Sequence, residues 1–322
     1  QTISFIDVFT NFAVLAREYN YTRPEITEDH CFAIQKGRHL VVEQNLQHNN
    51  TAYIANDCSL HTGQKLWLLT GPNMSGKSTF LKQNALLVIV AQIGAFIPAE
   101  SAKIGLVDRL FSRIGAADNL SKGQSSFMVE LIETSIILSQ ATYKSFFILD
   151  EVGRGTSTYD GVSIAWACLE HIHDKLQSRA LFATHYHELT QLKLQNLKNY
   201  TIKISEDNGK ILFRHEIIAG TADRSYGIHV SELAGITPSV TRRANQILGS
   251  LEQNNSGELF NFAATNLSEP TATQPEEHQA ILELKEQLSA LSPDDYSPRA
   301  ALELLYNLNQ KYKLGQDKDS HY

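Results

Sequence analysis

The feature that most constrains this chain is the segment 71–78, Gly-Pro-Asn-Met-Ser-Gly-Lys-Ser, which fits the phosphate-loop pattern G-x-x-x-x-G-K-S at every position. Gly71 and Gly76 let the backbone turn tightly and bring its N–H groups up to phosphate oxygens, because neither residue carries a Cβ. In such a loop Lys77 reaches the β- and γ-phosphates, and the Ser78 hydroxyl is a ligand of Mg²⁺. The segment therefore predicts a site for a nucleoside triphosphate with Mg²⁺.

The residues around the loop predict the strand and the helix that such a loop needs. Leu66–Thr70 is an apolar run typical of a strand, and residues 80–93 read as a buried helix. The N-terminal end of that helix carries the positive end of its dipole, which favours phosphate. The local pattern is therefore strand, loop and helix in the order that phosphate binding requires.

A second apolar strand, residues 146–151, ends in two carboxylates, Asp150 and Glu151. We expect Asp150 to hold Mg²⁺ through water or through Ser78, and Glu151 to polarise the water that attacks the γ-phosphate. An ordinary buried strand with an acidic end is the alternative, and the intact phosphate loop argues against it. Residues 180–185 form a third such strand, and His185 at its end is either a ligand-contacting group or an ordinary surface histidine.

Composition indicates an intracellular protein and excludes several other classes. The chain has 322 residues, of which 42% are hydrophobic, enough for one large α/β domain with appendages. Its three cysteines form no C-x-x-C pair, and it has no apolar run of membrane-spanning length. We therefore expect a cytoplasmic protein without a membrane partner.

Charge and histidine spacing argue against two further functions. The net charge is −7, with 35 acidic and 28 basic side chains, and no basic stripe is evident, so this segment is a poor candidate for the main DNA-gripping surface. His171 and His173 are two positions apart on a predicted helix and do not share a face, so they are poorly placed to chelate zinc together.

Residues 4–20 show the period of an amphipathic helix, residues 30–70 read as strands and turns, and residues 71–218 alternate as in a parallel, doubly wound sheet. Two short helices, near 227–234 and from Thr237 to about 252, suggest a helix-turn-helix used for packing or dimerisation rather than for DNA binding. Residues 253–278 read as a linker. The two amphipathic helices after it are too little to bury a core alone, so we expect them to associate with another copy or with the body.

Several motifs together closely resemble those of the MutS family of bacterial DNA mismatch repair proteins. They are Gly37-Arg38-His39, Thr70–Thr79, Ser125-Ser126-Phe127-Met128-Val129-Glu130, Asp150–Gly161, Ala183–Leu189, Ser225-Tyr226-Gly227 and Ser297–Leu302. The chain departs from the family pattern at Ser126, where Thr is usual, and at Leu40, where Pro is common. The resemblance runs from about residue 4 to 314.

The resemblance implies a P-loop NTPase of the ABC type, in which two subunits face each other and build two composite ATP sites. One chain supplies the phosphate loop with Asp150, Glu151 and His185, and the other supplies a signature serine. The family pattern places this serine at Ser125, although Leu120-Ser121-Lys122-Gly123-Gln124 looks superficially like the signature of membrane-transporter ATPases. The nucleotide contacts implied for this chain are Gly71, Pro72, Asn73, Met74, Ser75, Gly76, Lys77, Ser78 and Thr79, with Tyr53 and His215 at the adenine.

The same resemblance implies ATP and Mg²⁺ as cofactors, a homodimer, a possible tetramer through the tail, a MutL-like partner, and a place in the bacterial cytosol or nucleoid. The parent protein would bind mismatched DNA and use ATP to switch to a sliding clamp, whereas the mismatch-reading domain is expected to lie outside this segment. The implied divisions are the end of the lever or core helices (1–24), the ABC-type ATPase domain (25–222), the dimerising helix-turn-helix (223–252), a linker (253–278), the oligomerising helices (279–314) and a tail (315–322).

Two alternatives belong to other classes. A transporter-type ABC ATPase would share the phosphate loop and the paired acids, but the run Gly153–Thr158 is foreign to it. A nucleotide-gated dimerisation module would bind ATP and barely turn it over when separated from the DNA-binding half. The intact Lys77, Ser78, Asp150 and Glu151 argue for retained chemistry.

Overall fold

A computed structural model describes residues 2–73, 75–115, 125–207, 210–222, 226–255 and 299–300 of the chain. The chain divides into two units, Gln1–Asn254 and Asn255–Tyr322, and nearly all described residues belong to the first. In chain order the elements are α1 (Thr2–Glu18), β1 (Glu25–Thr27), β2 (Phe32–Gly37), α2 (Leu40–His48), β3 (Asn56–Leu60), β4 (Leu66–Thr70), α3 (Lys77–Gln92), β5 (Ser101–Gly105), β6 (Leu110–Arg113), α4 (Ser126–Gln140), β7 (Phe146–Asp150), α5 (Thr158–His171), the π-helical turn η2 (Ile172–Leu176), β8 (Arg179–Ala183), the 3₁₀ turn η3 (His187–Gln191), β9 (Leu197–Asp207), β10 (Lys210–Ala219), α6 (Gly227–Leu233) and α7 (Pro238–Asn255).

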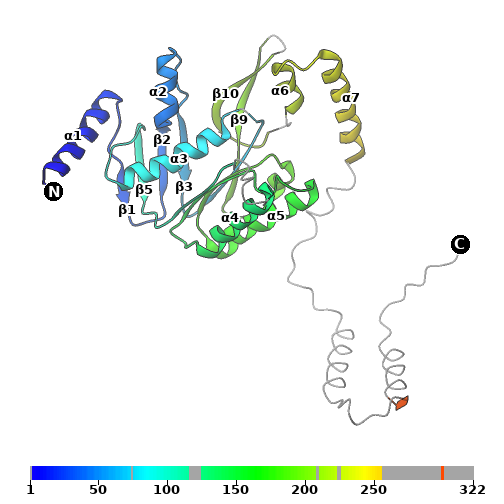
Figure 1. Cartoon of the computed structure of the whole chain (residues 1–322), viewed down its shortest axis with the longest axis horizontal. Helices are drawn as coiled ribbons and strands as arrows, with labels where there is room; N and C mark the ends of the chain where they lie inside the picture. The colour runs from blue at the N-terminus through cyan, green and yellow to red at the C-terminus, as the bar shows by residue number, and fades with distance from the viewer. Residues whose placement is uncertain are drawn as a thin grey trace. The chain divides into compact units, whose positions relative to one another are not determined.

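The centre of the first unit is a six-stranded sheet with the order β10-β9-β4-β8-β7-β6 (Figure 1). Strands β9, β4, β8, β7 and β6 run parallel, and β10 pairs antiparallel with β9 at the edge. The predicted α/β class with a mostly parallel sheet flanked by helices is therefore confirmed. Because parallel strands end at the same edge, the residues after β4, β7 and β8 are brought together there.

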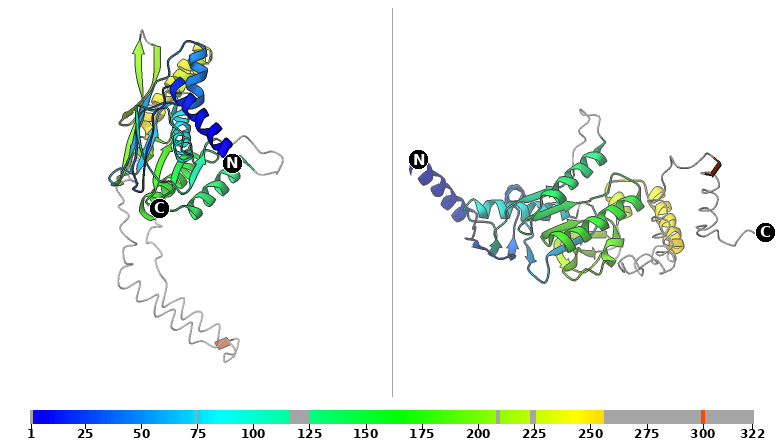
Figure 2. Two further views of the ribbon diagram at one scale, coloured as in Figure 1. Left: turned by 90° about the vertical axis from the view of Figure 1, so that its left-hand side faces the viewer. Right: turned by 90° about the horizontal axis from the view of Figure 1, so that it is seen from below.

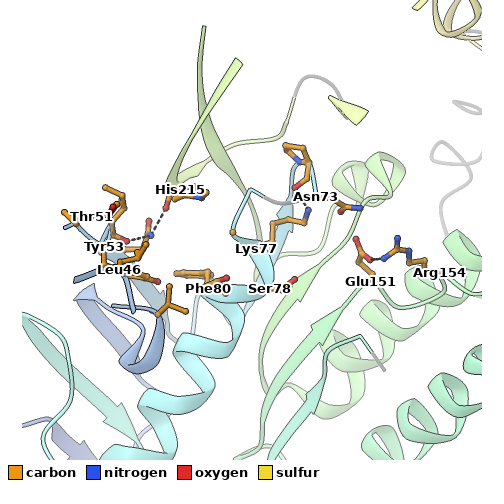
Figure 3. Close-up of a pocket in the computed structure, with 17 residues that line it drawn as sticks. Leu46, Thr51, Tyr53, Asn73, Lys77, Ser78, Phe80, Glu151, Arg154 and His215 are labelled. Atoms are coloured by element: carbon orange, nitrogen blue, oxygen red, sulfur yellow. Dashed lines mark hydrogen bonds and ion pairs between the residues drawn. The ribbon is translucent and has the colours of Figure 1, made fainter. Parts of the chain in front are cut away.

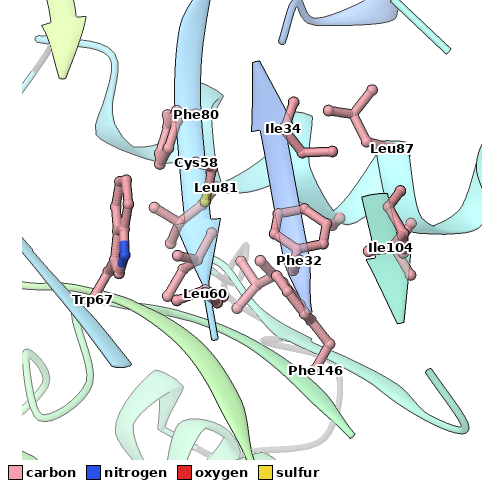
Figure 4. Packing of buried hydrophobic residues seen from close by; sticks show 14 of the residues in the cluster. Phe32, Ile34, Cys58, Leu60, Trp67, Phe80, Leu81, Leu87, Ile104 and Phe146 are labelled. Carbon is pink, nitrogen blue, oxygen red and sulfur yellow. The ribbon is translucent and has the colours of Figure 1, made fainter. Parts of the chain in front are cut away.

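Both faces of this sheet are buried, which explains why its central strands are apolar throughout rather than alternating. All five residues of β4 are buried. Trp67 and Leu69 point into a core shared with α3 and the smaller sheet (Figure 4), whereas Leu66 and Leu68 point into a second core with α5 and η3. The sheet is thus held rigidly from both sides, and its carboxyl edge is a fixed platform for the loops.

A second, four-stranded sheet has the order β1-β5-β2-β3, with β2 antiparallel to both of its neighbours. The sequence predicted only strands and turns between residues 30 and 70, so α2 was not expected. The β-branched pair Val41 and Val42 favours a strand. The helix forms because the His39 Nδ1 atom accepts hydrogen bonds from the backbone N–H groups of both valines, each at 3.3 Å, and so caps its N-terminus.

The His39 cap predicts a pH-dependent stability. Burial lowers the pKa of His39, so between this pKa and the ordinary one the unfolded chain binds more protons than the folded chain. The cap's contribution is therefore complete above the ordinary pKa of about 6.5 and is lost as the pH falls through the lower, folded pKa. In His39→Asn the amide oxygen keeps an acceptor that does not titrate. Between about pH 7.5 and 5.5 the wild-type free energy of unfolding in urea should fall by ~1 kcal/mol more than that of the variant. Equal losses in the two proteins would contradict this role.

Helix α1 confirms the helical period predicted for residues 4–20 and lies at the periphery of the first unit (Figure 2). Only Ala16 of this helix is buried. Helices α6 and α7 confirm the two helices expected near 227–234 and from Thr237. Residues 256–278 of the expected linker and nearly all of the expected tail helices lie outside the described residues. None of the described helices is long and apolar enough to cross a membrane.

Candidate functional site

The phosphate-loop residues form a tight turn between β4 and α3. Gly71 and Gly76 have φ values of 135° and 106°, a region that favours glycine, and α3 begins at the residue after Gly76. The Ser75 hydroxyl donates to the Pro72 carbonyl at 2.7 Å inside the turn. The helix N-terminus therefore opens at the end of β4, as the sequence predicted.

Lys77 lies at the centre of this turn. Its side-chain ammonium donates to the carbonyls of Gly71 and Pro72 at 2.5 and 2.8 Å, and the residue is only 4% exposed. Burial lowers the pKa of Lys77, and the nearby carboxylates of Glu151 and Asp150 act in the opposite direction. The Lys77 ammonium is thus held between the loop and the two acids.

His215 lies against the loop, although the chain reaches it 139 residues after Gly76. Its Nδ1 atom is 2.6 Å from the Ser75 carbonyl oxygen, and a Cβ added at Gly76 would come within 3.1 Å of the same nitrogen. A register shift in the β9–β10 pairing spans this residue, whose φ is 54°. The Asn56 side chain holds this part of β10, because it donates to the His215 carbonyl at 2.9 Å and accepts from the Ile217 N–H at 2.7 Å. Glycine is therefore favoured at position 76 by its φ, and the nearby His215 ring leaves little space for a Cβ.

A cavity of about 570 Å³ opens in front of the loop (Figure 3). Its polar end carries Lys77, Ser78 and Glu151, and its other end is formed by α2 and the segment that follows it. Of the predicted nucleotide contacts, the residues that line it are Tyr53, Pro72, Asn73, Gly76, Lys77, Ser78, Thr79 and His215. Gly71 and Ser75 do not line it, and Met74 lies outside the described residues.

Tyr53 is fixed by a residue that sequence reasoning missed. Its hydroxyl donates to the Gln83 Oε1 atom at 2.8 Å, and Gln83 is completely buried in α3. Burial raises the pKa of Tyr53 to about 12, so its hydroxyl stays protonated and keeps this hydrogen bond. Val42 and Leu46 of α2, which were also missed, supply apolar wall beside it. Val42 and Leu46 could not be predicted as lining residues, because α2 itself was not predicted.

Asp150 ends β7 and is 7% exposed. The Ser78 hydroxyl lies near its carboxylate, whose Oδ1 atom is buried without a hydrogen-bond partner. Burial raises the pKa of Asp150, and the nearby Ser78 hydroxyl opposes that shift. A buried carboxylate oxygen lacking a partner, beside a hydroxyl, is a donor pair that suits a hard cation such as Mg²⁺.

Glu151 takes a left-handed backbone conformation, with a φ of 55°, and its N–H donates to the Ala183 carbonyl at 2.9 Å. The carboxylate faces the cavity and pairs with the Arg154 guanidinium (Figure 3). The Glu151 side chain is 15% exposed and that of Arg154 is 62% exposed. Arg154 belongs to the Asp150–Gly161 motif, but it was not predicted to be a site residue. Its position three residues after Glu151 is the sequence feature that could have indicated the ion pair.

His185 and Ser125 do not line the cavity. His185 follows β8, and its ring stands 4.1 Å from that of Tyr186. His185 is exposed as a residue, yet partial burial of its imidazole lowers its pKa, while Glu151 acts to raise it. Ser125 is exposed and is the N-cap of α4, accepting from the Met128 N–H at 3.2 Å. The rival signature residue Ser121 lies outside the described residues.

Two kinds of comparison with known proteins bear on this arrangement. The chain matches the family model of MutS domain V over residues 67–252, and that of the DNA mismatch repair protein MutS C-terminal region over residues 275–311. It is 56% identical over 313 residues to the DNA mismatch repair protein MutS of Rickettsia akari (strain Hartford), covering 96% of this chain and 35% of that relative. It is 57% identical over 316 residues to the protein of the same name from Rickettsia bellii (strain RML369-C), covering 97% of this chain and 35% of the relative. The chain thus spans about a third of the length of these relatives.

Proposed function

This chain belongs to the MutS family of DNA mismatch repair proteins, and on that premise we propose that residues 25–222 bind and hydrolyse ATP in a site that a second copy of the chain completes. The observation that carries the proposal is the cavity in front of the phosphate loop, which has the cation Lys77 and the acid Glu151 at one end and an apolar wall at the other. A nucleoside triphosphate has the same division into a charged and an apolar part.

In this proposal the base lies between Tyr53 and His215, and the loop N–H groups with Lys77 bind the phosphates. The hydrogen bond from Tyr53 to Gln83 and the contact of His215 with Ser75 support it, because both side chains are held in place before any ligand arrives. Such preorganisation lowers the entropy cost of binding.

Ser78 and Asp150 would hold Mg²⁺, and the unpartnered Oδ1 atom of Asp150 supports this assignment. When bound, the ion would neutralise charge on the phosphate oxygens. Glu151 and Asp150 also act on the protein itself, since their carboxylates oppose the burial that lowers the pKa of Lys77. Among the described residues no group of three His, Cys, Asp or Glu side chains offers a competing metal site.

Glu151 would accept a proton from the attacking water, and His185 would lie at the γ-phosphate. The Glu151 backbone supports this role, because its N–H bond to Ala183 fixes the carboxylate at the carboxyl edge of the sheet. Burial lowers the pKa of His185, which favours the neutral imidazole, a form that can donate a hydrogen bond without adding a charge.

Ser125 would complete the site of the other subunit, as the signature serine acting in trans. Its exposure and its place at the N-terminus of a 15-residue helix support this role, because a hydroxyl and a helix dipole are then presented together on the surface. A homodimer through the ATPase and helix-turn-helix segments follows, with a tetramer through the tail. For the longer protein we propose mismatched DNA and a MutL-like protein as partners, clamp switching by ATP, and the bacterial cytosol or nucleoid as location.

A second candidate function has its own observation. The Arg154 guanidinium occupies one carboxylate oxygen of Glu151, which would hinder that group as a base. In that case the chain is a nucleotide-gated dimerisation module that binds ATP with little turnover. The two functions differ in turnover and agree in nucleotide binding.

The proposal predicts that ATP turnover per subunit, measured with Mg²⁺ over a wide range of protein concentration, climbs and then saturates as dimers form. Ser125→Ala should lower the saturating rate by roughly 10²- to 10³-fold, the usual effect of losing one donor to developing charge, with nucleotide still bound. Ser139→Ala, which changes a serine near the other end of α4, is the matched control and should leave the rate unchanged. Wild-type turnover in Ser125→Ala would contradict the assignment and point to Ser121. Bound nucleotide without turnover at any concentration would favour the second candidate.

A further inference from the structure

The loop that follows Glu151 is tied to two other parts of the site through one residue, Gly153. The Gly153 N–H donates to the Glu130 carboxylate of α4, and the Gly153 carbonyl accepts from the Tyr186 hydroxyl at 2.8 Å. Tyr186 is the residue next to His185. The backbone two residues beyond Glu151 is therefore held from both sides, by the helix that Ser125 begins and by the loop that carries His185.

The Glu130 carboxylate is buried, with its side chain 6% exposed, and each of its oxygens has a partner. One oxygen accepts from Gly153, and the other is 3.2 Å from the Arg113 guanidinium at the end of β6. Arg113 also pairs with Glu133, one turn further along α4, at 3.0 Å. A charge so buried is tolerated only while its partners stay in place, because an unpaired buried charge is strongly destabilising. The contact with Gly153 is therefore difficult to break.

A second contact prevents α4 and the loop from sliding past each other. A Cβ added at Gly155 would come within 2.6 Å of the Phe127 Cβ, so the loop backbone packs directly against the first turn of α4. Phe127 is two residues from Ser125. A rotation of the α4 N-terminus would therefore move the loop, and with it the backbone of Glu151.

We propose that Glu130 is a positioning residue that couples the two ATP sites of a dimer, because it joins the helix that presents Ser125 to the loop that follows Glu151. This inference rests on the proposed function, in which Ser125 serves the partner's site and Glu151 the chain's own. A change at either site is then transmitted through Glu130 to the other. Glu130 does not line the cavity, so it acts through Gly153 and through α4.

The test uses mixed dimers of the full chain, purified with two different tags. One subunit carries Glu151→Gln, which silences its own site, and its Ser125 still serves the live site of the wild-type partner. Adding Glu130→Gln to the silent subunit conserves volume but replaces two carboxylate oxygens by one amide oxygen, so one of the two links is lost. We expect kcat of the live site to fall roughly 10- to 100-fold, as for a small misplacement of a catalytic group, while KM changes less than about twofold.

The matched control is Glu133→Gln on the silent subunit. It makes the same change on the same helix and removes charge from the same arginine, but Glu133 does not contact Gly153. It should leave kcat of the live site within about twofold, a range of less than 0.5 kcal/mol. If Glu130→Gln does not fold, Glu130→Asp keeps the charge for Arg113, shortens the reach to Gly153 and carries the same expectation.

Three results would overturn the inference. The first is an unchanged live-site kcat in the Glu130 variant while Ser125→Ala on the silent subunit lowers it. The second is an equal loss in the Glu130 and Glu133 variants, which would indicate only a disturbed Arg113. The third is no effect of Ser125→Ala on the silent subunit, which would refute the composite site itself and leave no second site to couple.

Discussion

Replacing Glu151 by glutamine should abolish ATP hydrolysis and leave ATP binding intact. The amide has nearly the volume of the carboxylate, and the backbone that carries it is fixed by the N–H bond to Ala183, so the cavity keeps its shape. What the variant loses is the acceptor for the proton of the attacking water. A general base contributes about 10² to 10⁴ in rate, so kcat should fall by at least about 100-fold.

The measurement is single-turnover hydrolysis at saturating ATP, with nucleotide affinity determined separately by titration. Glu170→Gln is the matched control, because the Glu170 Oε1 atom accepts from the Trp166 indole on α5 and an amide oxygen can replace it. This control should hydrolyse ATP at the wild-type rate. A Glu151→Gln protein with wild-type turnover would remove Glu151 from the role of water activator. A variant that no longer binds ATP would instead assign it to binding.

Replacing Lys77 by methionine should reduce the affinity for ATP by about 100-fold or more, equivalent to roughly 3 kcal/mol. Methionine fills a similar volume with a flexible apolar side chain, so the substitution leaves no cavity inside the loop. The cation that faces Asp150 and Glu151 is lost, however, and two carboxylates are then left opposite the triphosphate. Repulsion between these like charges adds to the loss of the direct contact.

Calorimetric titration with ATP and with ADP, both in Mg²⁺, measures this effect. ATP should lose more affinity than ADP, because Lys77 is assigned to the β- and γ-phosphates. Lys82→Met on the exposed side of the same helix is the control and should bind both nucleotides as the wild type does. Equal losses for the two nucleotides would move the Lys77 contact away from the γ-phosphate, and unchanged affinity would refute the phosphate role.

The parts of the fold that could be predicted are those in which neighbouring residues dictate the structure. Strand β4, the phosphate turn and the start of α3 follow from one continuous segment, since glycine permits the positive φ at both ends of the turn. The parallel sheet followed from apolar strands alternating with helices. Helix α2 was not predicted, because two adjacent valines favour a strand. The helix depends on the His39 cap, which is a single side chain and leaves no periodic pattern of apolar residues in the sequence.

In the same way, the sequence by itself determined which groups are predicted to handle phosphate, because Lys77, Ser78, Asp150 and Glu151 stand in short motifs whose backbone is set locally. Only the tertiary structure decided how the rest of the site is assembled. The imidazole of His215 reaches Ser75 across 140 positions of sequence, and Glu130 reaches Gly153 across 23. Contacts of this kind depend on a β-strand irregularity and on the packing of α4 against the sheet, which are products of the whole fold and have no local pattern.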